Sequence, residues 1–462
     1  MEYRIETDLL GEMEIPADAY WGIHSRRARD NFPFSGALVN PSLITALAMV
    51  KKACCAANAE LGYIDNKRAE AINRACDEVI KGKFKEQFVV AALQGGAGTS
   101  TNMNVNEVIS NRALELLGKD KGDCSVIHPI ETLNLHQSTN DVYPTAVKVA
   151  VIFQLKKLSA GIALLQGAFQ KKEKEFAGIV KIGRTELQEA VPMTLGAEFS
   201  AFAGAFARDR WRVFKCEERV RTVNIGGTAV GTGLTAPRSY IFLVIEKLRE
   251  LTGLGLTRGE NLVDHTANSD SFVEISGILK AHAQNLIKIA NDLRLLHLLK
   301  EIELPKAQAG SSIMPGKVNP VIMEAAIQAG LKVIANDLLI TEAASRGTFQ
   351  INEFMPLLSH AILESLDMLI EINNVFASCV TAIQAGNSRH VEAVESSLAI
   401  MTAFLPVIGY EKATKLLKEF SSSQGKSIKD FLTNRLGKEL VDKTLSAGNL
   451  TSLGHKENAE NT

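Results

Sequence analysis

The eleven residues from Gly310 to Pro320, GSSIMPGKVNP, are the segment of this chain best suited to chemistry. Two serines follow a glycine, and a Met-Pro-Gly turn leads to Lys317 and Asn319. Such a loop exposes several backbone N–H groups and one ammonium in the same place, which is an arrangement that binds carboxylates. Gly310 and Gly316 permit a close backbone approach or a positive φ. A Gly-Ser-Ser triplet alone is typical of an ordinary surface turn, but the complete ordered string predicts an anion-binding loop.

The histidine and glycine patterns do not favour a metal or a nucleotide cofactor. The nine histidines are dispersed, without H-x-x-x-H spacing or clustering with cysteine, so we expect no metal site. The segment NIGGTAVGTGL (224–234) is rich in glycine but follows no predicted strand, and that context excludes a dinucleotide site. The sequence therefore predicts chemistry carried out by side chains and backbone amides, with no cofactor.

Composition and charge give no support for a nucleic acid or a membrane as the binding partner of this protein. Lys plus Arg (51) nearly balances Asp plus Glu (52), and a formal net charge of -1 gives no electrostatic reason to expect a nucleic acid or an anionic membrane as partner. No run of about 18 apolar residues is present, so we expect no transmembrane helix. The acidic N-terminus MEYRIETDLLGEMEIP lacks the pattern of a signal peptide, and six scattered cysteines favour the reducing cytoplasm.

Long helices are the elements that must position the chemical residues. Aromatic residues make up only 6%, while Ala, Leu, Ile, Lys and Glu dominate, which favours helix. The clearest pattern covers residues 268–299, where one apolar stripe recurs mostly at three- and four-residue steps: Phe272, Ile275, Leu279, Leu286, Ile289, Leu293 and Leu296. Similar patterns cover 142–176, 190–222, 320–344 and 356–386. Because strand-like alternation is scarce, we predict an all-α protein with a central bundle of long helices.

Proline and small polar residues mark the limits of these helices. Pro144 and Pro192 lie near the starts of two of them, where proline is tolerated in the first turn. Segments rich in Gly, Ser and Thr separate the helices, and functional residues are usually carried on such loops: 94–101, 136–140, 224–239 and 310–316. A helix as apolar as 268–299 also has Ala, Asn and Ser on its other faces, so we expect burial against other subunits.

The ordered pattern G-S-S-x-M-P-x-K-x-N resembles the active-site loop of the aspartase/fumarase superfamily. Further blocks resemble the same superfamily in the same order: IPADAYWGIHSRRARDNF (15–32), GAGTSTNMNVNEVISNRA (96–113), HPIETLNLHQSTNDVYPT (128–145), GRTELQEAVPMTLGAEF (183–199), NIGGTAVGTGL (224–234) and IGYEKATKLLKE (408–419). The resemblance therefore covers nearly the whole chain. QSTND before Val-Tyr-Pro-Thr, AVPMTLG and HTANSDSFVEISG (265–277) look more like the aspartate ammonia-lyase branch, whereas fumarases typically show SSND and ATPLTLG.

That resemblance implies a reversible deamination of L-aspartate to fumarate and ammonia. A base removes a Cβ proton, which creates an enediolate-like (aci-carboxylate) dianion, and the α-ammonium then leaves. Fixed donors must face the carboxylate that takes up the charge, and each is worth roughly 3–4 kcal/mol in comparable oxyanion sites. The resemblance assigns the base to Ser311, whose alkoxide needs nearby N–H groups or a cation such as Lys317. Lys317 is alternatively a point charge for a substrate carboxylate, and Asn319 offers amide donors and an acceptor.

By the same resemblance, small polar residues from three other blocks bind the substrate. Thr99, Ser138, Thr139 and Thr185 hold the two carboxylates, and Asn140 lies near the amino group. Hydroxyl groups suit this task because they donate to carboxylates without adding charge. Taken singly, each residue is more typical of a helix N-cap or a turn, but their coincidence in three family blocks favours a binding role.

Two further residues are left with two interpretations each. Arg27, in the N-terminal block, either closes over the site or forms a surface salt bridge. His136 lies just before the substrate loop and is equally consistent with a structural role.

The chain departs from its relatives at Glu186, where the superfamily usually has His or Gln after G-R-T. A carboxylate there would repel a dicarboxylate substrate, but it would pair with an α-ammonium that it faces. We therefore hypothesise that Glu186 binds the ammonium and takes part in proton transfer; a structural ion pair is the alternative. A second departure is the shorter segment LRLLHLLKEIELP (293–305), where relatives carry a Gly-Pro-Arg turn, and this bears on substrate fit.

The resemblance also implies an architecture and an assembly. It implies three domains: a mostly helical N-terminal domain (1–138), a central long-helix bundle (139–388) and a small helical C-terminal domain (389–462). It further implies a homotetramer whose active sites are each built from loops of three subunits. Fumarate hydratase, a lyase for another amino-succinate and a catalytically silent homologue are the alternatives, although Ser311, Lys317 and Asn319 argue against the last.

Overall fold

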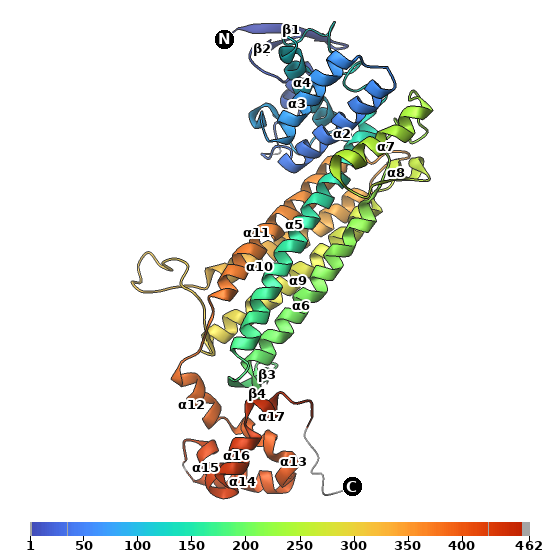
Figure 1. Cartoon of the computed structure of the whole chain (residues 1–462). Coiled ribbons are helices and arrows are strands. Elements are labelled where there is room, and N and C mark those ends of the chain that lie inside the picture. Colours follow the sequence, from blue (N-terminus) through green and yellow to red (C-terminus); the bar gives the residue numbers. More distant parts are fainter. Residues whose placement is uncertain (1, 35, 424, 455–462) are drawn as a thin grey trace. The chain divides into compact units, whose positions relative to one another are not determined.

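The structure of the protein is a computed structural model that describes residues 2–34, 36–423 and 425–454 (Figure 1). It is mostly helical, which confirms the predicted fold class. The chain forms two compact units. Unit 1 contains the chain as far as Ser159 together with Arg212–Ala281 and Lys332–Ile370, and unit 2 contains Ala160–Trp211, His282–Leu331 and the chain from Glu371 onward. The three domains implied by the family resemblance stay a prediction.

Five long helices dominate the fold, and all five contribute residues to both units. They are α5 (Thr139–Glu175), α6 (Leu195–Val220), α9 (Asp270–Leu298), α10 (Val321–Ala344) and α11 (Met355–Thr381). Each lies where an apolar pattern predicted it. The stripe predicted on 268–299 is buried, from Phe272 at 1% exposure to Leu296 at 4%. Burial of such a stripe, rather than helix propensity, supplies most of a long helix's stability.

Unit 1 also holds shorter elements, from the N-terminal region and from residues 222–267. Its strands are β1 (Tyr3–Asp8) and β2 (Gly11–Pro16), which form an antiparallel hairpin, and β5 (Thr222–Val223) parallel to β6 (Thr257–Arg258). Its shorter helices are α1 (Ile23–Asn31), α2 (Pro41–Glu60), α3 (Asn66–Ile80), the 3-10 turn η1 (Lys85–Gln87), α4 (Thr99–Leu116), α7 (Arg238–Thr252) and α8 (Leu262–Ala267). The N-caps follow the sequence signals: the side chain of Asn40 accepts from the amide of Ser42, and that of Asp65 from the amide of Arg68.

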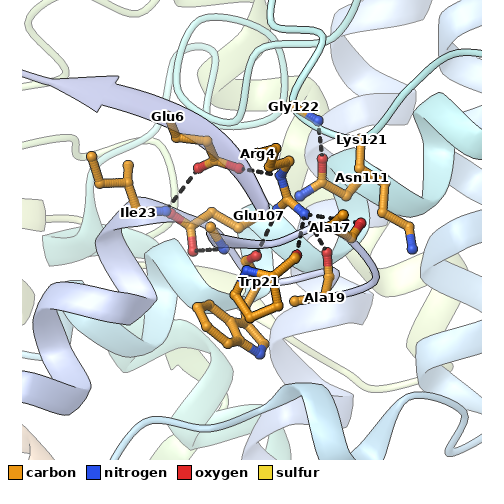
Figure 2. Close-up of polar contacts among 12 residues, drawn as sticks. Arg4, Glu6, Ala17, Ala19, Trp21, Ile23, Glu107, Asn111, Lys121 and Gly122 are labelled. Carbon is orange, nitrogen blue, oxygen red and sulfur yellow. Dashed lines mark hydrogen bonds and ion pairs between the residues drawn. The ribbon is translucent and has the colours of Figure 1, made fainter. Parts of the chain in front are cut away.

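Charged side chains of β1 and α4 bind backbone groups just before and at the start of α1 (Figure 2). The Arg4 guanidinium donates to the carbonyl oxygens of Ala19 and Trp21, both at 2.8 Å. The Glu6 carboxylate accepts from the amide of Ile23 at 2.8 Å. Glu107 on α4 accepts from the amides of Gly22, His24 and Ser25 and from the Ser25 hydroxyl. Two carboxylates therefore satisfy free N–H groups at the start of α1, and the one from Glu107 links that start to α4.

Unit 2 contains a hairpin that the sequence did not predict. Strands β3 (Val180–Thr185) and β4 (Gln188–Thr194) pair antiparallel, so the predicted helix start at residue 190 is wrong. Pro192 lies on β4 opposite Ile182 rather than in the first turn of α6. Pro144 likewise lies inside α5, because that helix begins earlier, at Thr139. A proline on a strand removes one ladder donor, and the register of this hairpin shifts close by, between Ile182 and Arg184.

The rest of unit 2 is a small helical region that packs on this hairpin. It comprises β7 (Ile302–Glu303), which pairs with β8 (Gln384–Ala385), and then α12 (Ser388–Ser396), the 3-10 helix η2 (Leu398–Phe404), α13 (Leu405–Ile408), α14 (Tyr410–Ser422), α15 (Ile428–Leu436), α16 (Lys438–Thr444) and α17 (Ala447–Leu450). Ile182 of β3 is part of its buried core, with Phe404, Ile428 and Leu432. Across the described parts of the chain, every helix is too short or too polar to cross a membrane.

Gly98 is required at the start of α4. Its φ is +93°, and a Cβ atom there would lie 2.5 Å from the ring of Tyr143, which is itself buried. We expect Gly98→Ala to lower the free energy of unfolding by about 3 kcal/mol, because overpacking adds to backbone strain. Gly118, at the other end of the same helix, has φ +69° and open space around it. We expect Gly118→Ala to lower the free energy of unfolding by only about 1 kcal/mol, the cost of backbone strain without a clash. Urea titrations of both variants measure these losses. Equal losses in the two variants would contradict the clash.

Candidate active site

The Gly310–Pro320 loop aims two of its own amides at the Ser311 hydroxyl. Ser311 Oγ accepts from the amide of Met314 at 2.9 Å and from that of Ile313 at 3.2 Å. Donors at an oxygen favour its charged form, which is the requirement that the sequence placed on a serine base. Ser311 is half-buried, so a substrate can reach it.

The glycines and Asn319 hold this loop in shape. The amide of Gly310 donates to the Lys317 carbonyl at 2.7 Å, and a Cβ on Gly310 would lie 2.8 Å from that oxygen. Gly316 has a φ of +82°. The side-chain amide of Asn319 donates to the Gly310 carbonyl at 3.0 Å, so one donor expected for substrate closes the loop instead. The side chain of Lys317 is exposed and makes no ion pair within the described part of the chain.

Four predicted substrate residues lie in unit 1, where α4 and α5 begin. Ser138 Oγ accepts from the amide of Asn140 at 3.2 Å, which leaves its hydroxyl proton free to donate elsewhere. Thr139 is buried, and its Oγ1 accepts from Asn102 on α4 at 3.1 Å. Thr99 is exposed at the first position of α4, and its hydroxyl donates to the Gly96 carbonyl at 2.8 Å. The first turns of two helices, with their outward N–H groups, therefore meet at these residues.

Asn140 also connects the Ser138 segment to the glycine-rich loop 224–234. Its side-chain amide donates to the Ala229 carbonyl at 2.7 Å, and its own carbonyl accepts from Asn224 Nδ2 at 2.9 Å. The Asn140 side chain, which the resemblance placed near the amino group of the substrate, therefore uses its N–H donor on the Ala229 carbonyl. The Asn140 Oδ1 atom is the part of this side chain that suits an ammonium.

Asp141 is a residue of this site that the sequence reasoning missed. It is fully buried, and its carboxylate accepts from the amides of Ser138 (3.0 Å), Gly226 (3.1 Å) and Thr228 (3.0 Å). One side chain therefore fixes both polar loops. Burial raises its pKa from the ordinary value of 3.8 to about 6, against the lowering effect of the three amides and of Lys51. The signal was available, since Asp141 follows directly after Ser138-Thr139-Asn140.

Lys51, on α2, is a second missed residue. It is fully buried, and its ammonium donates to Asn134 Oδ1 and Gln137 Oε1, both at 2.8 Å. Burial lowers its pKa from 10.5 to about 8. The sequence signal for this residue was its position, since a lysine is unexpected inside the Ala-rich, apolar pattern of residues 46–58. A buried cation that binds Asn134 and Gln137, and the buried carboxylate of Asp141, thus hold the chain on either side of the Ser138–Asn140 segment.

Thr185 and Glu186 lie at the exposed tip of the β3–β4 hairpin in unit 2. Glu186 and Leu187 form its two-residue turn, with φ of +52° and +64°, values that glycine and asparagine usually supply. Glu186 makes no ion pair among the described residues. It lines a cavity of about 470 Å³ together with Arg184, Lys288 and several leucines, a volume that suits a small ligand.

Arg27 and His136 have partners within unit 1. The Arg27 guanidinium donates to both oxygens of Asp8 at 2.8 Å and holds the pKa of that carboxyl below its ordinary value. His136 Nδ1 lies 2.7 Å from Asn58 Oδ1, and burial lowers the pKa of this histidine. Both geometries agree with structural roles. Within the described ranges, no three His, Cys, Asp or Glu side chains gather closely enough to hold a metal ion.

The residues predicted to form the active site thus fall into three groups according to the unit and the loop that carry them. Thr99, Ser138, Thr139 and Asn140 lie in unit 1, whereas Thr185 with Glu186, and Ser311 with Lys317 and Asn319, lie in unit 2. Among the described contacts, no hydrogen bond joins the hairpin tip to the serine loop. In Figure 1 the loop that joins α9 to α10 extends away from the helices of its own unit.

Comparison with known proteins gives one consistent result. A family pattern described as "Lyase" matches residues 11–335. An aspartate ammonia-lyase from a Bacillus species is 46% identical over 93% of each chain, and one from Pseudomonas aeruginosa is 47% identical over 90% of each. A solved "fumarate lyase:delta crystallin" from Brucella melitensis has a TM-score of 0.91 at 45% identity, covering 96% of this chain and 98% of that one. A class II fumarase from Schistosoma mansoni has a TM-score of 0.89 at 31% identity, with the same coverage.

The long-helix fold is that of a lyase. The match covers well over half of the chain and the relatives are covered almost completely. The chain belongs to the aspartase/fumarase superfamily of lyases, as its loop motifs predicted.

The raised pKa of Asp141 gives a testable pH dependence. Its folded-state pKa of about 6 lies above the ordinary 3.8, so the folded protein binds this proton more tightly, and stability falls as the pH rises through 6. Relative to Asp141→Asn, which cannot take up this proton, we expect wild type to lose about 1 kcal/mol of unfolding free energy between pH 5 and pH 7. Urea titrations at several pH values measure this difference. Histidine titrations are common to both proteins and cancel, and a difference independent of pH would refute the assignment.

Proposed function

We propose that this protein is an aspartate ammonia-lyase, which interconverts L-aspartate with fumarate and ammonia. The observation that carries the proposal is the Ser311 hydroxyl held by the amides of Ile313 and Met314, on a loop that also carries the exposed side chain of Lys317. Relatives at 46% and 47% identity bear that name, which supports the choice of substrate.

The reaction is a proton abstraction followed by loss of a leaving group. Ser311, as the alkoxide, takes a Cβ proton, and the C–H electron pair moves into the adjacent carboxylate, which becomes an aci-carboxylate dianion. That pair then returns to form the Cα–Cβ double bond as the C–N bond breaks and ammonia departs. Amides and the Lys317 ammonium are matched to the dianion more than to the substrate, and this difference lowers the barrier.

The other residues have binding roles in this proposal. Thr99, Ser138, Thr139 and Thr185 donate to the two carboxylates, and Asn140 accepts from the ammonium. Asn319 acts mainly by closing the serine loop. The hydroxyls of Ser138 and the three threonines lie at helix starts or at a hairpin tip. Neighbouring backbone N–H groups there are further donors for a carboxylate.

A homotetramer with active sites shared by three subunits would bring the three groups of residues together. The described chain leaves apolar side chains exposed on its long helices, among them Trp211 (65%), Phe214 (66%) and Leu338 (63%), and on the serine loop, where Ile313 is 85% exposed. Patches of this kind mark association surfaces. We place the enzyme in the cytoplasm and assign it no cofactor.

Two related activities are the alternatives. A fumarate hydratase would act on malate, and the class II fumarase fold is shared at 31% identity. A lyase for another amino-succinate would be favoured by Glu186 and by the short segment 293–305. Glu186 favours an amino substrate over malate, because the leaving group of malate is an uncharged hydroxyl.

The base assignment is tested by Ser311→Ala. We expect kcat for L-aspartate, followed by fumarate absorbance, to fall by at least about a thousandfold, since no other group replaces the hydroxyl. The matched control is Ser312→Ala, the exposed neighbour, for which we expect a loss of less than about tenfold. An assay of malate alongside aspartate separates the lyase from a hydratase.

The same variant tests whether the sites are shared. When Ser311→Ala and Ser138→Ala protomers are dissociated together and reassembled, some sites receive both intact residues, so activity returns. Reassembly of either variant alone is the control. A mixture as inactive as its parents would count against composite sites.

The role of Glu186 is tested by its effect on substrate choice. We expect Glu186→Gln to raise KM for L-aspartate by about tenfold, because a charge pair with the ammonium is lost, while inhibition by succinate, which has no ammonium, changes little. Glu189→Gln, three residues along the same hairpin, removes an equal charge. It should leave KM for L-aspartate and the inhibition constant of succinate nearly unchanged. If aspartate kinetics are the same in Glu186→Gln and wild type, the ammonium-binding role is discarded.

A further inference from the structure

Glu301 in unit 2 is a buried carboxylate held between two cations of β3. It is 3% exposed, and its Oε2 lies 2.7 Å from the ammonium of Lys181. Its Oε1 accepts a hydrogen bond from the guanidinium of Arg184. Lys181 is itself 2% exposed and pairs on its other side with Glu198. The four charges balance, so each buried group is compensated only while the whole cluster is intact.

The backbone around Glu301 is fixed by three segments of unit 2. The Glu301 amide donates to the Leu296 carbonyl at 2.9 Å, and its carbonyl accepts from the amide of Gly386 at 2.8 Å. Lys300, just before it, has a φ of +62°. A Cβ on residue 386 would lie 1.9 Å from the Lys300 carbonyl, so only glycine fits there. This carboxylate therefore presents a fixed anchor to β3.

The anchor acts where the β3–β4 ladder is weakest. The register of the hairpin shifts between Ile182 and Arg184, so backbone pairing is interrupted just before the tip. Arg184 directly precedes Thr185 and Glu186, and its guanidinium also donates to the Ile182 carbonyl at 3.2 Å. The contact from Glu301 to Arg184 therefore supplies the constraint that the interrupted ladder lacks.

Glu301 also begins the stem of the serine loop. Strand β7 follows it at Ile302–Glu303 and pairs with β8, and the chain then runs to Gly310. One buried residue thus anchors two elements that carry predicted site residues. It lies in the short segment in which this chain departs from its relatives.

We propose that Glu301 is a positioning residue of the active site, which holds the Thr185–Glu186 tip in its binding geometry through Arg184. The inference rests on the proposed function, because Thr185 and Glu186 are taken as substrate-binding groups. Glu301 itself does not contact the substrate. It affects substrate binding only by holding the hairpin.

Kinetics of Glu301→Gln test this role. We expect KM for L-aspartate to rise by at least about tenfold while kcat stays within about threefold, because binding geometry is loosened at the hairpin and the base on Ser311 is intact. The matched control is Glu198→Gln, which also takes one carboxylate from Lys181 but leaves Arg184 held. A residue that only supported folding would reduce the amount of active enzyme, and hence kcat, without changing KM. Equal KM values for Glu301→Gln and wild type would overturn the proposal.

Hydrogen exchange gives a readout that needs no turnover. We expect amides in the peptide 182–190 to exchange at least about tenfold faster in Glu301→Gln than in wild type, and not in Glu198→Gln. If wild type failed to deaminate aspartate, the proposed function would fail while this result still decided the anchoring role. If Glu301→Gln does not fold, Arg184→Lys keeps the Lys181–Glu301 pair and removes only the guanidinium contact. Wild-type exchange and wild-type KM in Arg184→Lys would equally rule the proposal out.

Discussion

The need to satisfy backbone N–H groups away from water is the constraint on which the candidate site depends. Where loops enter a protein interior, every free amide must find an acceptor. In unit 1 the buried Asp141 carboxylate meets this need for three amides from two separate loops, and it thereby places Ser138 at the start of α5. In unit 2 the Ser311 hydroxyl accepts from two amides of its own loop. In both places the bonded amides fix the position of a serine of the candidate site.

Charge inside the protein is arranged around the polar loops in the same way. Glu107 and Glu6 complete the start of α1, Lys51 holds the chain just before the Ser138 segment, and Glu301 holds the hairpin of unit 2. Each buried charge costs desolvation energy, and fixed neighbours offset that cost only in one geometry. Such groups favour a single arrangement of the loops they contact. Glu301, for example, binds Arg184, the residue that precedes the exposed Thr185–Glu186 tip.

Much of the fold could be predicted from the sequence, because apolar residues repeat at helical spacing over all five long helices. The serine loop could also be predicted, since its residue types and order are rarely met elsewhere. The β3–β4 hairpin could not: the run from Ala190 to Leu195 is apolar in a pattern that suits either a strand or a helix, and Pro192 fits both. Asp141 and Lys51 each had a local signal in the sequence, but the partners that they and Glu301 bind are tertiary contacts, which spacing along the chain does not show.

The two buried groups that hold the chain on either side of the Ser138 segment have opposite sensitivities to acid and base. Asp141 becomes neutral below about pH 6, and Lys51 becomes neutral above about pH 8. Only in the interval between them does the interior hold a complete internal dipole, with its positive end at Lys51. Because Asp141 binds amides of both polar loops, a change in its charge reaches both loops at once.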